Sequence, residues 1–357
     1  MLFTPIKISG LQIQNRFIRS ATHEWLCEED GTPTRAIGDI YETLAKYDVG
    51  LIITGYSYVT PSGKSSKRQH GIYSDRFIDP YRMITERVHR YNCKIALQIV
   101  HGGRQALVTP DYPVPLAPSA VRDSSSGITP AVMDEKQILK TIEDFAQAVR
   151  RAQAAGFDVV QLHIAHGFLL SSFISPYTNR RTDYWGGSVE NRMHIITKIM
   201  ERSRELVGVD YPVMVKMNAT DGFSNYGLDA PECVEIACML ESAGICAIEV
   251  SGGIFEAGEI MAQQGIDAKE KEAYFKDYAK MIKEAVDVPV ILVGGLRSKA
   301  VMEQVLTKGY ADMVSLSRPF IREPDLVVKF RDKGVDRAQC ISCNECFNEN
   351  GVKCSLR

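Results

Sequence analysis

The sequence predicts a (β/α)8 barrel followed by a short cysteine-rich tail. Short apolar runs alternate with longer amphipathic stretches, and the alternation occurs eight times. Several of the runs are apolar almost throughout, which is typical of parallel strands buried on both faces. The 357 residues also suit one barrel domain. A doubly wound parallel sheet is the alternative fold.

Each expected strand is a β-branched or apolar run, and the eight runs are 17–22, 51–59, 94–100, 159–165, 212–218, 247–251, 289–293 and 313–317. The expected helices have amphipathic spacing, and they are 36–47, 79–92, 135–155, 188–207, 231–244, 272–286, 298–308 and 323–333. Residues 101–134 are rich in Pro, Ser and Gly and predict a long functional loop. We therefore expect the barrel over residues 1–333 and a cysteine-rich extension over residues 334–357.

Composition narrows the class of protein. Lys and Arg total 42 and Asp and Glu total 44, so no basic excess supports nucleic-acid binding as the main task. No run of about 18 apolar residues predicts a membrane span. The first ten residues do not resemble a secretory leader, and nine cysteines then suggest a reducing compartment. We expect a cytoplasmic protein.

Polar residues gather where the expected strands end. Barrel active sites lie at the carboxyl ends of the strands. The polar and small residues found at or near those ends are Ser20, Ala21, Thr22, His23, Gln98, His163, His166, Lys216, Gly294, Gly295, Ser317 and Arg318. Their convergence predicts a site at one mouth of the barrel.

The last two strand ends predict a phosphate site. Gly294 and Gly295 allow the backbone to approach an anion, and Arg318 beside Ser317 adds a forked cation. The alternative for the two glycines is a tight turn alone. His163 and His166 could bind a metal or donate two hydrogen bonds to a developing oxyanion.

These residues carry a resemblance to a known family. Residues 163–192, HIAHGFLLSSFISPYTNRRTDYWGGSVENR, resemble the signature HxAHGYL…SPxxNxRxDxYGGSxxNR of the Old Yellow Enzyme family of FMN-dependent NAD(P)H oxidoreductases. The resemblance runs from FTPIKISGLQIQNRF near the start to ADMVSLSRPFIREP at 311–324, so it covers nearly the whole chain. The chain also resembles the barrel portion of 2,4-dienoyl-CoA reductases.

The resemblance implies FMN in the barrel mouth, reduced by NADH or NADPH. It implies that the phosphate lies at Gly294, Gly295, Ser317 and Arg318, and that the ring system is lined by Ser20, Ala21, Thr22, Gly55 and Tyr56. Gln98 would meet the pyrimidine edge, and Lys216 would lie near N1 and O2, where a cation favours the reduced flavin. His163 and His166 would bind the carbonyl oxygen of an α,β-unsaturated substrate. The resemblance also implies a homo-oligomer.

One departure concerns the proton donor. The family places a Tyr two residues after the second His, and this chain has Phe168, which has no proton to give. We expect His23 as the first alternative donor, ahead of Tyr56, Tyr58 and Tyr177, with solvent also open. Two alternative functions remain open. One is an FMN dehydrogenase or electron-transfer flavoprotein of another substrate class, and the other is a barrel that binds no flavin.

Four of the nine cysteines fall in the last 18 residues, with the spacing C-x2-C-x2-C-x7-C. Four thiolates so close suit a [4Fe–4S] cluster or a Zn²⁺ ion, and the resemblance to dienoyl-CoA reductases implies a cluster here. Their usual spacing differs from this one. The expected ligands are Cys340, Cys343, Cys346 and Cys354, and such a cluster could pass electrons to a redox partner protein. The alternative is free thiols.

Overall fold

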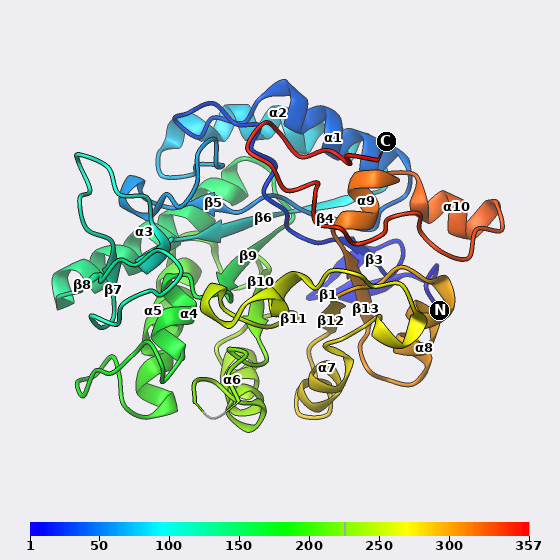
Figure 1. The fold of residues 1–357 in the computed structure, drawn as a ribbon. Helices are drawn as coiled ribbons and strands as arrows, with labels where there is room; N and C mark the ends of the chain where they lie inside the picture. Colours follow the sequence, from blue (N-terminus) through cyan, green and yellow to red (C-terminus); the bar gives the residue numbers. More distant parts are fainter. Residues whose placement is uncertain (225, 357) are drawn as a thin grey trace.

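Eight parallel strands close into a barrel in this computed structural model, which describes residues 1–224 and 226–356 (Figure 1). Around the barrel the strands are β3 (Phe17–Arg19), β4 (Leu51–Ile53), β6 (Lys94–Val100), β9 (Val159–Ile164), β10 (Val213–Asn218), β11 (Ile248–Ser251), β12 (Val290–Val293) and β13 (Met313–Leu316). Closure comes from β4, which pairs with β3 on one side and with β6 on the other. The predicted barrel is confirmed, and the open doubly wound sheet is excluded.

Helices cover the outside of the strands (Figure 1). Those that follow the successive barrel strands are α1 (Arg35–Lys46), α2 (Ile78–His89), α3 (Glu135–Ala154), α5 (Val189–Val207), α6 (Ala230–Ser242), α7 (Lys276–Lys283), α8 (Lys299–Thr307) and α10 (Leu326–Asp332). Helix α7 starts four residues later than expected. Ala273 has a left-handed φ of 56°, which interrupts the helix, and the Glu272 carboxylate instead accepts hydrogen bonds from the backbone of Arg297 and Ser298.

A short hairpin closes the far end of the barrel. Strands β1 (Ile6–Ile8) and β2 (Leu11–Ile13) pair antiparallel, and they bring Ile8 and Ile13 into a buried cluster with barrel residues such as Leu51 and Met214. Three-residue strands are too short to produce a periodic signal, so the sequence analysis did not predict them.

Smaller strands and helices lie at the mouth of the barrel. They are β5 (Ser57–Tyr58), the parallel pair β7 (Leu116–Ala117) and β8 (Ala131–Val132), and the short helices α4 (Leu169–Ile174) and α9 (Arg318–Arg322). The predicted long loop 101–134 therefore carries β7 and β8. Within the described residues, no helix is long and apolar enough to cross a membrane.

The segment after α10 packs against the barrel. The backbone N–H of Lys299 donates to the carbonyl of Asp336, and that of Val352 donates to the carbonyl of Glu24 (2.8 Å). In Figure 1 this segment is the red end of the chain, which passes beside α9. Arg357, the last residue of the predicted extension, lies outside the described residues.

Candidate active site

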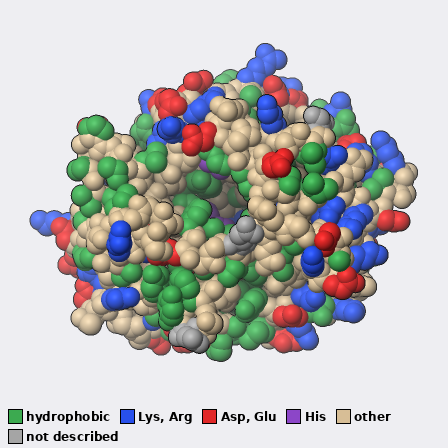
Figure 2. Space-filling view, in the orientation of Figure 1, with side chains coloured by type: hydrophobic (Ala, Val, Ile, Leu, Met, Phe, Trp, Pro, Cys, Tyr) green, Lys and Arg blue, Asp and Glu red, His purple; other side chains and the backbone are tan. Residues whose placement is uncertain are grey.

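A cavity opens at the carboxyl ends of the barrel strands. The space-filling view shows the hollow in the middle of this face, with histidine side chains inside it (Figure 2). The predicted site residues that line the cavity are Ser20, Ala21, Thr22, His23, Tyr56, His166, Lys216, Gly294, Gly295, Ser317 and Arg318. Strand ends that are far apart in the sequence thus supply one site.

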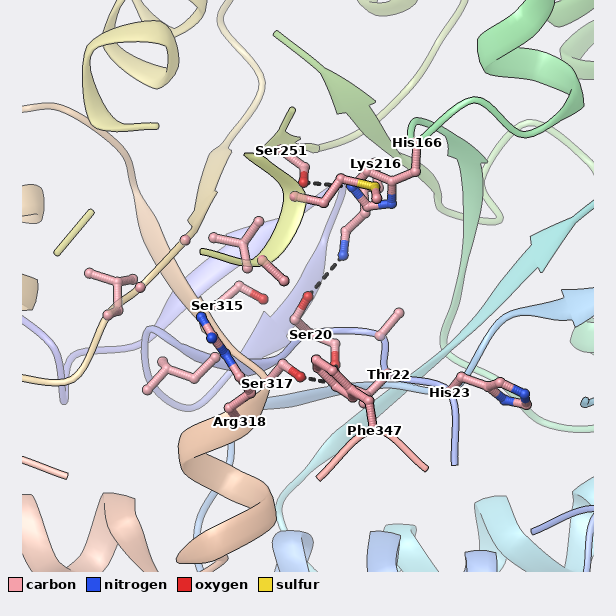
Figure 3. A pocket seen from close by; sticks show the side chains of 18 of the residues that line it. Ser20, Thr22, His23, His166, Lys216, Ser251, Ser315, Ser317, Arg318 and Phe347 are labelled. Carbon is pink, nitrogen blue, oxygen red and sulfur yellow. Dashed lines mark hydrogen bonds between the residues drawn. The ribbon is translucent and has the colours of Figure 1, made fainter. Parts of the chain in front are cut away.

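The predicted phosphate corner combines a glycine turn with a cation. Gly294 and Gly295 have φ values of 131° and 67°, which side-chain-bearing residues rarely adopt. A Cβ on either glycine would lie within 3.0 Å of the Tyr274 ring, so the turn has no room for a side chain. Arg318 faces the cavity, with Nη1 held by the carbonyl of Gln263 (2.8 Å) and by Oδ1 of Asn344 (2.7 Å) (Figure 3).

Lys216 approaches the cavity from another side (Figure 3). Its Nζ donates to Oγ of Ser20 (2.9 Å) and lies 3.3 Å from Oε2 of Glu249. Lys216 and Glu249 are both buried, so each charge depends on the other for compensation. Glu249 was not among the predicted site residues, although a charged residue inside an otherwise apolar strand is a recognisable signal.

His166 lines the cavity in a strained but well-supported backbone conformation. Its φ is 64°, while its N–H donates to Oδ1 of Asn218 (3.1 Å) and its carbonyl accepts from Gln105 (3.0 Å). The ring Nε2 is 2.8 Å from Oγ of Ser251. Burial, assisted by the charge of Lys216, lowers the pKa of His166 to about 3, so the ring is neutral near pH 7.

His163 lies deeper than predicted and is not among the residues that line the cavity. Its ring centroid is 5.0 Å from that of His166 and 4.8 Å from that of Phe168. Burial lowers its pKa well below 6.5. Nδ1 accepts a hydrogen bond from the backbone of Ala165, so the proton of the neutral ring resides on Nε2, which can donate.

Gln98 and Gly55 also lie behind the cavity wall. Nε2 of Gln98 donates to Gln161 (2.7 Å), whose own Nε2 donates to Glu249 (2.9 Å). The N–H of Gly55 donates to the hydroxyl of Tyr41, and a Cβ at Gly55 would collide with the Glu24 carboxylate. Gln98 is therefore linked to Glu249 through Gln161, and Gly55 is linked to Glu24 through Tyr41.

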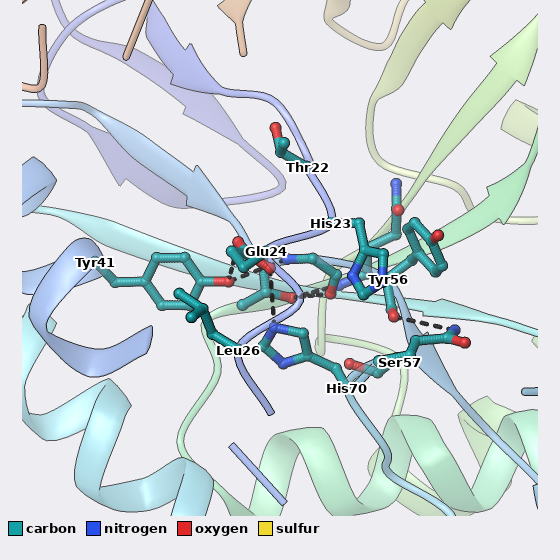
Figure 4. A network of polar contacts seen from close by, with 12 residues as sticks. Thr22, His23, Glu24, Leu26, Tyr41, Tyr56, Ser57 and His70 are labelled. Carbon is teal, nitrogen blue, oxygen red and sulfur yellow. Dashed lines mark hydrogen bonds and ion pairs between the residues drawn. The ribbon is translucent and has the colours of Figure 1, made fainter. Parts of the chain in front are cut away.

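Beneath the loop that follows β3 lies a buried ionic network centred on Glu24 (Figure 4). The carboxylate accepts from Arg19 (2.6 Å) and Tyr41 (2.8 Å), and lies 3.0 Å from Nε2 of His70. Burial alone would raise the pKa of Glu24, but Arg19 and His70 outweigh it and lower the pKa to about 2. For His70, the Cys27 thiol and Glu24 outweigh the effect of burial and raise the pKa to about 10.

The predicted proton donor His23 sits above this network as a neutral ring. Its Nε2 is 2.9 Å from Oγ of Ser66, and its buried Nδ1 has no partner among the residues described. Burial lowers its pKa to about 4. Its ring packs at a tilt against those of Trp25 and Tyr56, with centroid distances of 4.1 and 5.1 Å.

Phe168 occupies the position of the usual proton-donating tyrosine. It is buried, and its ring packs against Tyr56 (5.4 Å between centroids), His163 and Phe255. Of the other predicted donors, Tyr58 donates its hydroxyl to the carbonyl of Asp30 and Tyr177 donates to Glu256. Tyr56 is the tyrosine among them that lines the cavity.

The four cysteines of the C-terminal segment line one small cavity together with Arg318 and Arg322. Yet no group of three or more Cys, His, Asp or Glu side chains is positioned to hold a metal ion within residues 1–224 and 226–356. The prediction of an iron–sulfur or zinc site on Cys340, Cys343, Cys346 and Cys354 is not supported.

Comparison with known proteins matches residues 1–336 to the NADH:flavin oxidoreductase / NADH oxidase family. The chain belongs to this family. It is 33% identical over 324 residues to an NADPH dehydrogenase of Bacillus subtilis (strain 168), covering 90% of this chain and 92% of that one. It is 36% identical over 348 residues to an NADH oxidase of Thermoanaerobacter brockii, covering 96% of this chain and 52% of that one. The chain therefore spans about half the length of this second relative.

Solved structures agree. A 2-naphthoyl-CoA reductase complex superimposes with a TM-score of 0.89 at 25% identity, over 96% of this chain and 54% of that one. An Old Yellow Enzyme homologue from Zymomonas mobilis gives a TM-score of 0.80 at 25% identity, over 95% of each chain. The predicted resemblance to the Old Yellow Enzyme family is confirmed, and with it an FMN-dependent NADH or NADPH oxidoreductase family.

The residues present fit FMN. A glycine turn beside Arg318 suits a phosphate, because backbone N–H groups and a guanidinium can both donate to its oxygens. Lys216 faces the same cavity from a separate strand, where it can meet a ring that gains negative charge on reduction. The neutral histidine His166 borders the space that remains.

Proposed function

We propose that this protein uses FMN and NADH or NADPH to reduce the activated C=C bond of an α,β-unsaturated carbonyl compound. The observation that supports the proposal best is the pair of neutral imidazoles at the end of β9, beside the cavity that Lys216 and Arg318 border. FMN bound there would supply hydride transfer to the substrate.

His166, which lines the cavity, would bind the substrate carbonyl oxygen, and Nε2 of His163, whose ring centroid is 5.0 Å from that of His166, would be the second donor. A neutral imidazole donates one hydrogen bond without placing a full charge in the site, and it strengthens that bond as the oxygen becomes more negative. The strained backbone of His166, held at both its N–H and its carbonyl, would fix the direction of that donor.

Aromatic rings would exclude water and orient a flat substrate. Trp25, Tyr56 and Phe255 line the cavity, with Phe168 packed behind Tyr56. Because conjugated carbonyl compounds are planar and largely apolar, such rings favour them over charged or branched molecules.

Among the predicted proton donors, Tyr56 suits the step better than His23. With a pKa of about 4, His23 is protonated in about one molecule in a thousand at pH 7. Burial raises the pKa of Tyr56, so its phenol keeps its proton at all ordinary pH values. We propose that Tyr56 or solvent protonates the product and that His23 positions the Tyr56 ring by packing against it.

Anaerobic spectroscopy tests the function. The purified protein should show flavin absorbance that NADH or NADPH bleaches, and 2-cyclohexenone should then restore it with formation of cyclohexanone. Bleaching without reoxidation by any enone or enal would instead favour a dehydrogenase or electron-transfer flavoprotein. A protein that cannot be loaded with FMN would refute the proposal.

A further inference from the structure

We infer that Glu249 is a positioning residue that holds Lys216 and sets the reduction potential of the bound flavin. This inference rests on the proposed function, since it needs FMN in the cavity that Lys216 borders. The resemblance to the family assigned a role to Lys216 and none to Glu249.

Glu249 is the hub of the polar layer beneath the cavity. Oε1 accepts hydrogen bonds from Ser20 (2.8 Å) and Ser315 (2.7 Å), and Oε2 accepts from Gln161 (2.9 Å). The side chain is fully buried on β11. Its partners come from β9, β10 and β13 and from the end of β3, so one carboxylate joins side chains from around the barrel.

Two contacts hold Lys216, and Glu249 governs both. The Nζ lies 3.3 Å from Oε2 of Glu249, and it also donates to Oγ of Ser20, which in turn donates to Oε1 of Glu249. Figure 3 shows the Lys216 side chain extending to Ser20. Three hydrogen bonds from neutral donors fix the Glu249 carboxylate. Because Lys216 is held by that carboxylate and by Ser20, its ammonium group has little freedom to move.

The same geometry determines how much charge the flavin meets. Reduction adds negative charge to the flavin ring, and a nearby ammonium favours that state. A carboxylate 3.3 Å behind the ammonium opposes it, because in a buried site a charge acts over several ångströms with little screening. Glu249 therefore holds the potential below the value that Lys216 alone would give.

Gln98 is linked to the same carboxylate through Gln161. Gln98 lies behind the cavity wall, so Glu249 also fixes the layer of side chains beneath the cavity. A residue that orients Lys216 and also carries a charge should change the potential when only its charge is removed.

The test is an anaerobic spectrophotometric titration of the FMN-loaded protein against redox dyes of known potential. Glu249→Gln keeps the size of the side chain and removes its charge. We expect it to favour the reduced flavin at least tenfold, which is an increase of about 30 mV for a two-electron couple. Lys216→Met should change the potential in the opposite direction.

Control variants separate charge from structure. Asp158→Asn removes a half-buried carboxylate paired with Lys94 (3.0 Å) at the opposite ends of the strands, and it should leave the potential unchanged. Ser315→Ala removes one hydrogen bond to Glu249 and no charge, so its effect should be smaller than that of Glu249→Gln. In the Lys216→Met background, Glu249→Gln should produce a different change from the one it produces alone.

The outcomes distinguish a failure of this inference from a failure of the proposed function on which it rests. An FMN-loaded Glu249→Gln protein with the parental potential would overturn the role of Glu249 and leave the proposed function intact. A parent protein that cannot bind FMN would overturn both. If Glu249→Gln does not fold, Glu249→Asp, which draws the carboxylate back from Lys216, should raise the potential, and no rise would overturn the inference.

Discussion

Replacement of Glu24 by Gln should destabilise the protein by several kcal/mol. The Glu24 side chain is fully buried, and it balances the buried guanidinium of Arg19 and the imidazole of His70. Its pKa of about 2, against 4.5 for an unperturbed carboxyl group, corresponds to about 3 kcal/mol of stabilisation. Removing one partner of a buried ion pair typically costs about 3–5 kcal/mol, which agrees with the value from the pKa shift.

Urea unfolding measures this effect. With an m-value near or above ~3 kcal/mol/M, the midpoint should fall by roughly 1 M at pH 6. Glu303→Gln is the matched control, because Glu303 pairs with the exposed N-terminal amine and should contribute less than about 1 kcal/mol. Equal midpoints for Glu24→Gln and the parent protein would refute the reasoning.

The contributions of Glu24 and His70 to stability also depend on pH, and they are lost in opposite directions. The folded pKa of Glu24 is lowered, so its contribution is present above about pH 4.5 and is lost as the pH falls toward 2. The difference between parent and Glu24→Gln should therefore shrink in acid. The pKa of His70 is raised to about 10, so its contribution is present below about pH 6.5 and is lost as the pH rises through 10.

Three further predictions concern the cavity. Phe168→Tyr should retain FMN and accelerate enone reduction about tenfold or more in stopped-flow reoxidation, since it supplies a proton donor beside His163; an unchanged rate would show that the hydroxyl is not limiting. Gly295→Ala should weaken FMN binding about tenfold or more in fluorescence titration, because φ is 67° and the Cβ would meet Tyr274 at 2.9 Å; Gly309→Ala, with φ of 70° and open space, is its control. The rate of enone reduction should stay flat from pH 5 to 8 as far as the substrate-binding imidazoles are concerned, because the pKa of His166 is about 3; a decline centred near pH 6.5 would contradict this.

The sequence predicted the barrel well because each strand is buried on both faces. A run such as that of β4 or β12 is apolar throughout, and eight buried runs leave few alternatives. The strand ends then located most of the cavity, since parallel strands in a barrel end at one mouth. Whether a side chain reaches the cavity was not predictable in this way. His163 stands at a strand end, yet it is not among the residues that line the cavity.

Networks that join distant segments were missed for a physical reason. Glu24 and His70 are 46 positions apart, and Ser20 and Glu249 are 229 apart, so neither pair leaves a local pattern. A partial signal did exist in β11, where Glu249 stands among Ile, Val and Ser in a buried strand. Because a buried carboxylate needs partners, that position implied several donors facing it, although it did not identify them.

The C-terminal segment contributes to the cavity through residues that the cysteine spacing did not predict. The spacing predicted a metal site, which is not supported within the described residues, whereas the contacts with the cavity come from other residues of the segment. Ser342 and Phe347 line the cavity, and Figure 3 shows Phe347 there. Asn344 joins Arg318 to the carbonyl of Ala262. Because these contacts fix the guanidinium expected to bind phosphate, the predicted boundary at residue 333 divides the sequence at a point where the site continues across it.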